Sequence, residues 1–354
     1  MKQVQPLMDT INLKALSAAE LEAFVRTLGL PSYRSRQILH RLYEKEALSI
    51  GEMTELSKRL RDTLSERSYI SSLPILDSRR SADGTRKFLF GLEDGEKVES
   101  VLIPDEDRLT LCISSQVGCA LRCRFCLTGT LGLRRNLLPH EIVDQVISVR
   151  RAVAPAQITN IVLMGMGEPL ANFDNVVEAL ERMTGLMHIS PRRITLSTAG
   201  IVPKLRQLPR GAPMVNLAIS LNATTDEVRS MIMPINRTYP LRELIKACRE
   251  FPLPPRRRIT FEYVMLKGVN DSPEDARRLI GLLKGIPSKV NLIPFNPFPG
   301  SEFGRPDDGR VLAFQDILLR GHVTALVRKS KGQDILSACG QLRADYAATE
   351  RSSA

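Results

Sequence analysis

The sequence is short of histidine and has no long apolar run. Only four histidines occur among 354 residues. The chain therefore has few residues for a metal site built from several histidines or for catalysis that uses several histidines as acids and bases. No stretch approaches the roughly 18 consecutive apolar residues that a membrane-spanning helix needs. Residues 1–12 lack an apolar core followed by a small-residue cleavage site, which argues against secretion. These absences predict a soluble, cytoplasmic protein without a membrane partner.

The composition is that of an ordinary globular protein. Hydrophobic residues make up 43% and charged residues 25% of the chain, and its length predicts about two domains. Lys and Arg (50) exceed Asp and Glu (39), which gives a net charge of +11. A basic chain gains affinity for phosphate backbones by releasing counterions, but many housekeeping enzymes are equally basic. The arginine pairs are scattered, which suits either a folded surface that touches RNA at several points or several solvated helix faces.

The chain divides into a helical part, a short β part and a long alternating part. Residues 1–72 have helical spacing, with a capping box from Ser17 to Glu20 and further helices expected at 32–44 and 52–67. Between residues 73 and 104 the apolar period changes to two, with turn signals at Asp83-Gly84 and Asp94-Gly95, which predicts an antiparallel meander.

From about residue 110 apolar strands alternate with helices. Such an order predicts either a parallel barrel or a doubly wound sheet, and in both folds ligands bind at the carboxyl ends of the strands. The strands are expected at 110–115, 159–164, 193–198, 214–220, 259–265 and 289–294, and residues 322–328 are a candidate for one more. The helices are expected at 140–152, 174–184, 202–208, 240–250, 273–284 and 310–320.

Three cysteines follow the first of these strands within eight residues: Cys119, Cys123 and Cys126. Three thiolates on one loop can hold a 4Fe-4S cluster and leave one iron open to a substrate. A zinc site needs a fourth ligand, and neither a nearby histidine nor a second cysteine pair supplies one. A structural disulfide conflicts with a cytoplasmic location. The cluster is therefore the preferred interpretation.

Polar residues end several of the other strands. Gly167 and Glu168 follow the second strand, Ser197 ends the third, and the fourth ends at Ser220-Leu221-Asn222, while Asn296 follows the sixth. Taken singly, each side chain could cap a helix or bind the backbone polar groups of a loop, which is what Ser and Asn most often do. Together they predict a polar ring around one mouth of the barrel.

The C-x3-C-x2-C spacing resembles the signature of the radical S-adenosylmethionine (SAM) superfamily, and the resemblance extends over residues 110–295. It implies a partial (β/α)6 barrel. It also implies that the open iron binds the amino and carboxylate groups of SAM and that SAM is cleaved to a 5′-deoxyadenosyl radical. Gly165-Met-Gly167-Glu168-Pro169 resembles the motif that holds the SAM amino group. The polar residues of the preceding paragraph then become SAM contacts.

Four further motifs closely resemble the radical-SAM RNA methyltransferases of the RlmN type, in the same order along the chain. They are Val98-Glu99-Ser-Val-Leu-Ile-Pro104, Cys112-Ile-Ser-Ser-Gln-Val-Gly-Cys119, Met164 to Leu170 and Ala338-Cys339-Gly-Gln-Leu342. The resemblance implies an RNA-binding helical domain at 1–72, an antiparallel linker at 73–108, the barrel at 109–330 and a C-terminal segment at 331–354. It departs from the commonest pattern at Asn222, where many members have histidine.

By this resemblance, one SAM methylates Cys339, whose thiolate is the nucleophile. A radical derived from a second SAM abstracts a hydrogen from that methyl group, and the carbon radical adds to an electron-poor adenine carbon. Cys112 then resolves the RNA–protein adduct, leaving a transient Cys112–Cys339 disulfide that a reductant reopens. Glu99 corresponds to the proton acceptor of the family, and the alternative for Glu99 is a solvated charge on an edge strand.

The sequence thus predicts an enzyme that methylates carbon 2 of an adenosine in 23S ribosomal RNA, with the adenosine 3′ to the tRNA anticodon as a second substrate. A flavodoxin-type electron donor and a monomeric state are expected with it. The nearest alternative is methylation of carbon 8 of the same ribosomal adenosine. An alternative from another class is a basic RNA-binding protein with a structural metal and no catalysis.

Overall fold

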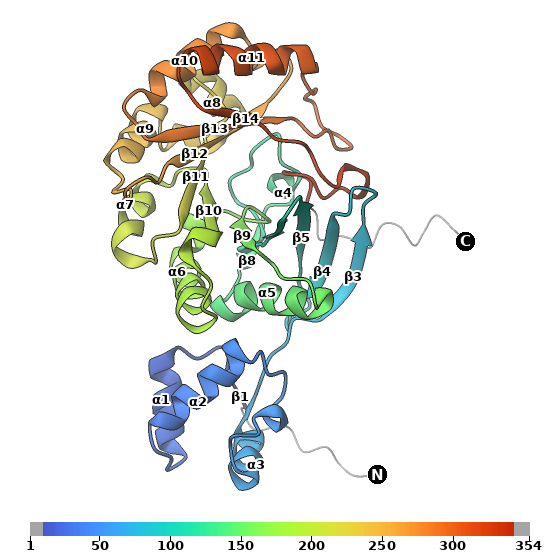
Figure 1. Cartoon of the computed structure of the whole chain (residues 1–354), viewed down its shortest axis with the longest axis vertical. Helices are drawn as coiled ribbons and strands as arrows, with labels where there is room; N and C mark the ends of the chain where they lie inside the picture. The colour runs from blue at the N-terminus through green and yellow to red at the C-terminus, as the bar shows by residue number, and fades with distance from the viewer. Residues whose placement is uncertain (1–9, 343–354) are drawn as a thin grey trace, which may run out of the picture.

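The computed structural model describes residues 10–342. Its first part is a helical unit that lies below the rest of the chain in Figure 1. The unit contains helices α1 (Ala18–Thr27), α2 (Tyr33–Leu39) and α3 (Lys58–Arg67), helical turns at His40–Glu44 and Ile50–Glu52, and the paired short strands β1 (Ile11–Asn12) and β2 (Ser68–Tyr69). Within the described residues, no helix is both long and apolar enough to cross a membrane.

The predicted capping box is confirmed, whereas one predicted helix starts later than expected. The Glu20 amide donates to Ser17 Oγ (3.3 Å), and the Ser17 amide donates to Glu20 Oε2 (2.8 Å). The helix expected from residue 52 begins only at Lys58, because Ser57 caps it by accepting a hydrogen bond from the Leu60 amide (3.3 Å). A side-chain cap of this kind favours an extended residue just before the helix and so stops it from extending backward.

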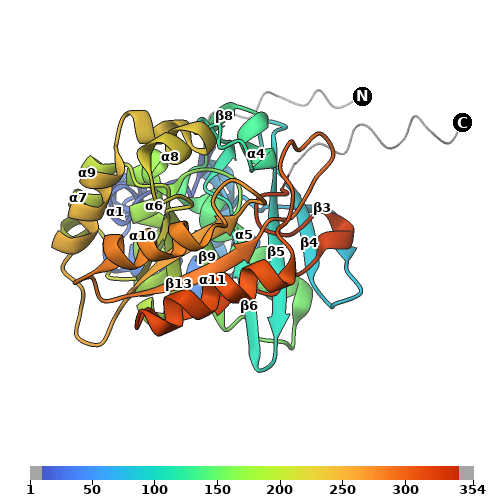
Figure 2. The ribbon, with the colours of Figure 1, turned by 90° about the horizontal axis from the view of Figure 1, so that it is seen from above.

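The remaining residues build one ten-stranded sheet, curved into a partial barrel (Figures 1 and 2). The parallel strands are β6 (Arg108–Cys112), β9 (Asn160–Leu163), β10 (Ile194–Thr198), β11 (Asn216–Ser220), β12 (Ile259–Met265), β13 (Ser288–Pro294) and β14 (Ala325–Val327). The six expected strands and the candidate seventh are thus confirmed. Their buried, apolar side chains make the central core, as parallel strands require.

The antiparallel meander forms as predicted, but it does not stand apart from the barrel. Its strands are β3 (Ile75–Arg80), β4 (Arg86–Gly91) and β5 (Lys97–Asp105). Strand β5 pairs antiparallel with β6, so the meander continues the barrel sheet at one edge. This pairing places Val101 of β5 opposite Cys112 of β6.

Helices cover the outer face of the parallel strands (Figures 1 and 2). All six expected helices are present: α5 (Pro139–Val153), α6 (Phe173–Glu181), α7 (Val202–Gly211), α9 (Leu241–Glu250), α10 (Pro273–Leu283) and α11 (Asp308–Arg320). The sequence did not predict helices α4 (Leu127–Thr130) and α8 (Asp226–Ile232), nor the hairpin of β7 (Gln116–Gly118) and β8 (Leu133–Asn136) that flanks the cysteine loop. These elements are too short for a hydrophobic period to show.

A buried polar network joins the helical unit to the barrel. Lys14 Nζ contacts Asp144 Oδ1 at 2.7 Å, and the two side chains are only 1% and 4% exposed. Arg182 donates to the Lys14 carbonyl (2.6 Å) and to the hydroxyl of Tyr43 (2.6 Å). Separating the helical unit from the barrel would leave these buried charges without partners, which costs free energy. The network therefore fixes the helical unit in one position on the barrel.

The Lys14→Met variant is expected to lower the free energy of unfolding by about 3–5 kcal/mol, because it leaves the Asp144 charge buried without its partner. Urea denaturation measures the change. The double variant Lys14→Met/Asp144→Leu should recover most of the loss, since it removes both charges. Lys45→Met, which breaks an exposed pair with Glu44, should cost less than about 1 kcal/mol. Equal losses in the double and single variants would contradict the ion-pair argument.

Candidate active site

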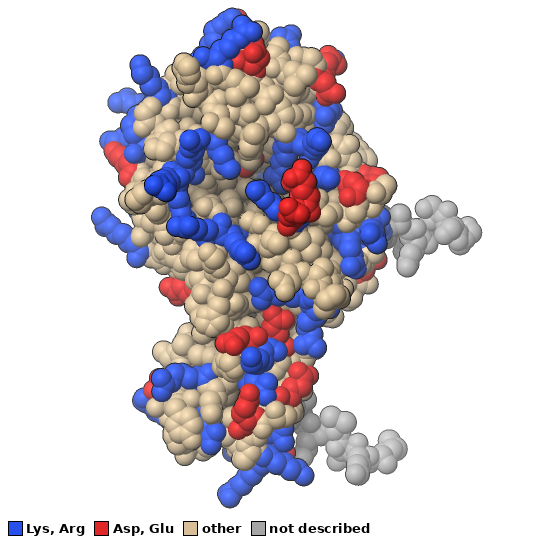
Figure 3. Space-filling view, viewed as in Figure 1, with Lys and Arg blue, Asp and Glu red and all other residues tan. Residues whose placement is uncertain are grey.

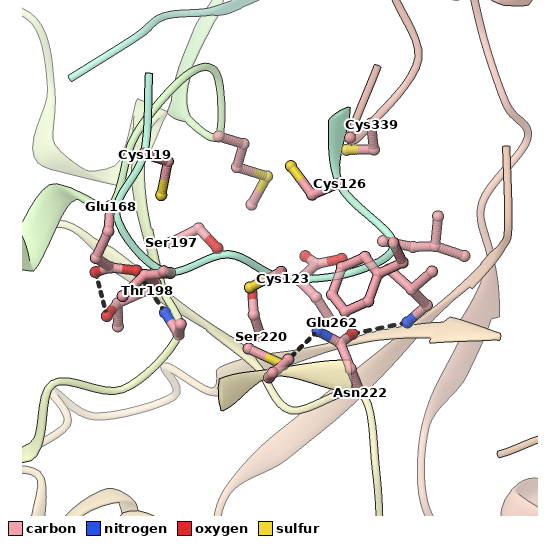
Figure 4. Close-up of a pocket in the computed structure, with 18 of the residues that line it drawn as sticks. Cys119, Cys123, Cys126, Glu168, Ser197, Thr198, Ser220, Asn222, Glu262 and Cys339 are labelled. Carbon is pink, nitrogen blue, oxygen red and sulfur yellow. Dashed lines mark hydrogen bonds between the residues drawn. The ribbon is translucent and has the colours of Figure 1, made fainter. Parts of the chain in front are cut away.

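The three cysteines lie on one loop between β7 and α4, and all three line a single cavity (Figure 4). The hairpin that carries this loop closes tightly at Gly118, which has φ +78°. A Cβ atom at this position would lie 1.9 Å from the Gly132 carbonyl oxygen, so only glycine fits. The carbonyl of Cys123 accepts a hydrogen bond from the amide of Cys126 (3.1 Å), which folds the loop around the cavity.

The chemistry of these thiols fits an iron–sulfur cluster. All three are free thiols, and burial raises the pKa of Cys119 to about 12 and also raises those of Cys123 and Cys126. Thiolates in such a pocket need a cation, and metal binding provides it by displacing the protons. Within residues 10–342, no three His, Cys, Asp or Glu side chains converge closely enough to hold one metal ion. A cluster does not require that convergence, because each thiolate binds a different iron.

Polar side chains from the ends of the parallel strands form the opposite wall of the cavity. The wall contains Gly165, Gly167, Glu168, Ser197, Thr198, Ser220, Asn222, Glu262 and Asn296. In Figure 4, Ser197 lies below Cys119, and Ser220 lies below Cys123. The structure therefore brings together most of the residues that the sequence placed at the barrel mouth. Leu221 is the exception, because its side chain is fully buried and lines neither of the cavities described here.

The glycines after β9 allow the loop that contains them to lie very close to the segment that follows β6. A Cβ atom on Gly165 would lie 2.7 Å from the Ile113 carbonyl oxygen, and one on Gly167 would lie 2.6 Å from Cβ of Gln116. Gly167 also has φ +102°, which side-chain-bearing residues rarely adopt. These glycines therefore pack the loop after β9 against residues 113–116, which lead from β6 into β7.

The Glu168 carboxylate is already engaged by the chain. It accepts hydrogen bonds from Thr198 Oγ1 (2.6 Å) and from the amides of Ala199 (2.7 Å) and Leu170 (3.0 Å). Burial raises its pKa, and the two amides oppose that effect. A carboxylate has about four acceptor positions, so one remains for a ligand in the cavity. Glu168 thus ties β9 to β10 as well as facing the site.

Asn222 is held in place by the chain rather than extended into the cavity. It is 1% exposed and has φ +58°, a conformation that Asn tolerates better than most residues. Its Oδ1 accepts a hydrogen bond from the Val264 amide (2.8 Å), and its Nδ2 lies 3.2 Å from the sulfur of Met233. The side chain therefore fixes the end of β11 beside β12.

Cys112 and Cys339 meet at a second cavity that adjoins the first. The volume of the second cavity is about 540 Å³. Cys126, Asn296 and Cys339 line both cavities. Both Cys112 and Cys339 are free thiols. Burial, with a smaller contribution from the nearby Cys339, raises the pKa of Cys112 to about 12. Cys339 is exposed as a residue, but the protein around its sulfur still raises the pKa of the thiol, whereas the guanidinium of Arg328 opposes the rise.

Glu99 is buried, so the alternative of a solvated edge-strand charge is wrong. Its side chain is 0% exposed, and its Oε1 pairs with Nζ of Lys87 at 3.1 Å. It lines neither cavity, but it lies two residues before Val101 on β5 and hence on the same face of the sheet as Cys112. Lys87 also donates to the Leu336 carbonyl (3.3 Å), close to Cys339 in the chain.

The turn between β3 and β4 holds the segment before Cys339, residues 332–336. Asp334 accepts hydrogen bonds from Ser81 Oγ (2.6 Å) and from the Ala82 amide (3.2 Å). Asp83 in the same turn accepts one from the Gly332 amide (2.8 Å). We call these contacts the clasp. On the other side of Cys339, the Gly340 carbonyl accepts a hydrogen bond from the amide of Leu127 in the cysteine loop (2.6 Å).

Two charged residues of the site were missed from the sequence. Glu262 is the one charged residue in the buried strand β12, and a charge inside a buried strand is a signal that could have found it. Arg328, which lines the second cavity, was counted only among the scattered basic residues. Figure 3 shows Lys and Arg side chains spread over the barrel part of one face, with a few acidic side chains among them.

Two known families match separate parts of the chain. Residues 113–280 match the Radical SAM superfamily. Residues 11–70, which form the helical unit, match the family described as the ribosomal RNA large subunit methyltransferase N-terminal domain.

Individual proteins resemble the chain over nearly its whole length. A protein of Geobacter sulfurreducens named dual-specificity RNA methyltransferase RlmN is 56% identical, with 98% of this chain and 96% of that protein covered. Its namesake in Pelobacter propionicus is 55% identical, with 95% and 97% covered. Among solved structures, a radical SAM methyltransferase from Sphaerobacter thermophilus is 45% identical, with 95% of this chain and 100% of that chain covered and a TM-score of 0.89.

Proposed function

This chain belongs to the RlmN family of radical-SAM RNA methyltransferases, and we propose that it methylates carbon 2 of one adenosine in 23S ribosomal RNA. We also propose the adenosine 3′ to the anticodon of tRNA as a second substrate, since the relatives are named dual-specificity enzymes. The observation that carries the proposal is the position of Cys339 in the walls of two adjoining cavities. One cavity holds the three loop cysteines, and the other holds Cys112.

The family membership establishes a 4Fe-4S cluster and SAM as the cofactors. Cys119, Cys123 and Cys126 would hold the cluster, which supplies the electron that cleaves SAM to a 5′-deoxyadenosyl radical. We assign the SAM contacts to the wall opposite these cysteines. Glu168 offers its remaining acceptor position to the SAM ammonium group, and the side chains of Ser197, Ser220 and Asn296 surround the rest of the molecule, with Gly167 contributing backbone. Asn222 lines the same wall but holds the chain in place there, and Leu221, which lines neither cavity, is left out of the contacts.

Cys339 is the proposed methyl carrier because it lies between the two cavities. Its sulfur accepts a methyl group by displacement at the SAM sulfonium and later presents that carbon to the adenine. Adenine carbon 2 lies between two ring nitrogens and is too electron-poor to attack a sulfonium itself, so the carbon must arrive as a radical. Arg328 favours the thiolate form of Cys339 that the first step needs, because it lowers the pKa of the thiol against the effect of burial.

Cys112 and Glu99 complete the reaction in this proposal. The adduct formed by radical addition carries an unpaired electron, which it would pass to the oxidised cluster as the ring proton is lost. Cys112 then attacks the Cys339 sulfur, the bond from this sulfur to the methylene carbon breaks with its electron pair on the carbon, and the carbon takes up a proton to become the methyl group. The disulfide that remains is reduced to both thiols by an external reductant of the flavodoxin or thiol type. Glu99 accepts the proton that leaves the adenine ring. Its place on the Cys112 face of β5 supports this role, and Lys87 links the carboxylate to the segment that carries Cys339.

The RNA contacts are assigned to the helical unit and to the basic face of the barrel. Residues 1–72 form the proposed RNA-binding domain, residues 73–108 connect it to the barrel at 109–330, and residues 331–354 carry Cys339. The part of the last segment beyond residue 342 lies outside the described residues. The charge of +11 supports contacts with a phosphate backbone. Such substrates place the reaction in the cytoplasm, and we expect a monomer to perform it.

Nucleoside mass spectrometry tests the proposal directly. A 23S RNA fragment is incubated anaerobically with the cluster-loaded protein, SAM and a reductant, and its digested nucleosides are compared with standards methylated at carbon 2 and at carbon 8. We expect 2-methyladenosine, and a tRNA substrate should give the same nucleoside. Methylation at carbon 8 instead would overturn the choice of carbon. SAM cleavage without RNA methylation would overturn the substrate.

A further inference from the structure

Glu262 is the one carboxylate on the wall of the first cavity to which the proposed function gives no role. It lies in the middle of β12 and is only 5% exposed. In the sheet register it stands beside Ser220 of β11 on one side and Asn291 of β13 on the other. Residues in register on neighbouring strands point to the same face, so the three form a polar row on the inner wall.

The two oxygens of this carboxylate differ in their surroundings. Oε1 accepts a hydrogen bond from Asn291 Nδ2 at 3.0 Å. Oε2 is buried and has no hydrogen-bond partner among residues 10–342. A buried charged oxygen without a partner is costly, and native structures rarely keep one unless something else satisfies it. The free oxygen therefore indicates a hydrogen-bond donor that belongs to a ligand.

The location of Glu262 narrows the choice of ligand. Figure 4 shows its carboxylate in the middle of the cavity, between Ser220 and the side that carries Cys126 and Cys339. Arg328 and Lys289 already supply positive charge nearby, as shown by their lowering of the Glu262 pKa against the larger effect of burial. A neutral O–H or N–H group is therefore sufficient as the missing donor.

We propose that Glu262 Oε2 accepts a hydrogen bond from a ribose hydroxyl of the SAM molecule bound in this cavity. This inference rests on the proposed function, which directs the SAM ammonium group to Glu168 after β9. The sheet order then places β10 and β11 between Glu168 and Glu262. Ribose follows the amino acid part along the SAM molecule, so it lies farther along the same wall. An acidic side chain on a ribose hydroxyl is also how dinucleotide-binding sheets recognise a nucleoside.

The test measures binding and does not depend on turnover. S-Adenosylhomocysteine and its 2′-deoxy and 3′-deoxy analogues are titrated anaerobically into the cluster-loaded protein in a calorimeter. We expect the wild type to bind one deoxy analogue about 10- to 100-fold more weakly than the parent compound, as the loss of a charge-assisted hydrogen bond predicts. The Glu262→Gln variant should bind the parent compound more weakly and lose most of the discrimination between it and that analogue.

Two further variants make the result interpretable. Glu250→Gln, an exposed carboxamide substitution on α9, should keep the wild-type affinities and discrimination. Glu262→Asp keeps the charge but draws it back from the cavity, and it should lose discrimination as the Gln variant does. Iron content and circular dichroism check that each variant is folded and loaded, and the Asp variant decides the question if the Gln variant fails this check.

The contrary outcomes are distinct. Unchanged discrimination in both Glu262 variants would overturn the inference while leaving the SAM site intact. Weaker binding of the substrate RNA, with S-adenosylhomocysteine binding unchanged, would assign the free oxygen to the target adenosine and would also overturn it. No binding of S-adenosylhomocysteine to the loaded wild type would overturn the proposed SAM site itself.

Discussion

The Cys339→Ala variant is expected to produce no methylated RNA, a loss of about four orders of magnitude or more, because it removes the sulfur that we propose as the methyl carrier. The variant should still contain iron and cleave SAM, since the three cysteines of the cluster loop are unchanged. Nucleoside mass spectrometry measures the first effect and release of 5′-deoxyadenosine the second. The intact mass of the purified wild type should include a methyl group on Cys339 that the variant lacks.

Cys248 provides the matched control for this experiment. It is buried in α9 and lines neither cavity, so Cys248→Ala removes a buried thiol without touching the site. We expect this variant to methylate RNA at a rate close to that of the wild type. Cys112→Ala should behave differently again, because it leaves the adduct unresolved and makes an RNA–protein species that persists on a denaturing gel. RNA methylation by Cys339→Ala would refute the carrier role.

Loss of one cluster ligand is expected to remove both iron and all activity. In the Cys123→Ala variant two thiols remain on the loop, which are too few to retain a 4Fe-4S cluster with one open iron. Iron and acid-labile sulfide should fall to near background after anaerobic reconstitution, and neither SAM cleavage nor RNA methylation should remain. The contrast with Cys339→Ala, which keeps the iron and the SAM cleavage, separates the cluster role from the carrier role. Full iron content in Cys123→Ala would contradict the ligand assignment.

The sequence predicted the barrel well because its signals are local. Each parallel strand is a short apolar run followed by a helix, and this order alone is enough to predict a sheet with its ligands at the strand ends. The position of the cysteine loop after the first strand then placed the site. Short elements such as α8 and the hairpin around the cysteine loop were missed, since seven residues or fewer carry no clear period.

The parts of the site that the sequence could not predict depend on contacts between distant residues. The burial of Glu99 follows from β4 and β5 pairing beside the barrel, with Lys87 placed next to it. Asn291 on the next strand binds one oxygen of Glu262, and the other oxygen has no partner among residues 10–342. Nothing in the flanking residues of Asp334 shows that it meets the turn between β3 and β4. Such contacts depend on the register of strands, which the local pattern leaves open.

The clasp has a consequence for how the protein is made. Ser81 and Asp334 are 253 residues apart in the chain, and the ribosome releases the N-terminal partner first. While the whole barrel is synthesised, the hydrogen-bonding groups of the turn between β3 and β4 are therefore bound to water instead of to residues 332–334. The thiol of Cys339, the proposed methyl carrier, is brought to the site only after residues 332–336 have been synthesised and have docked on this turn. A nascent barrel without that segment therefore lacks the proposed carrier, so synthesis of the barrel and its first turnover are separated in time.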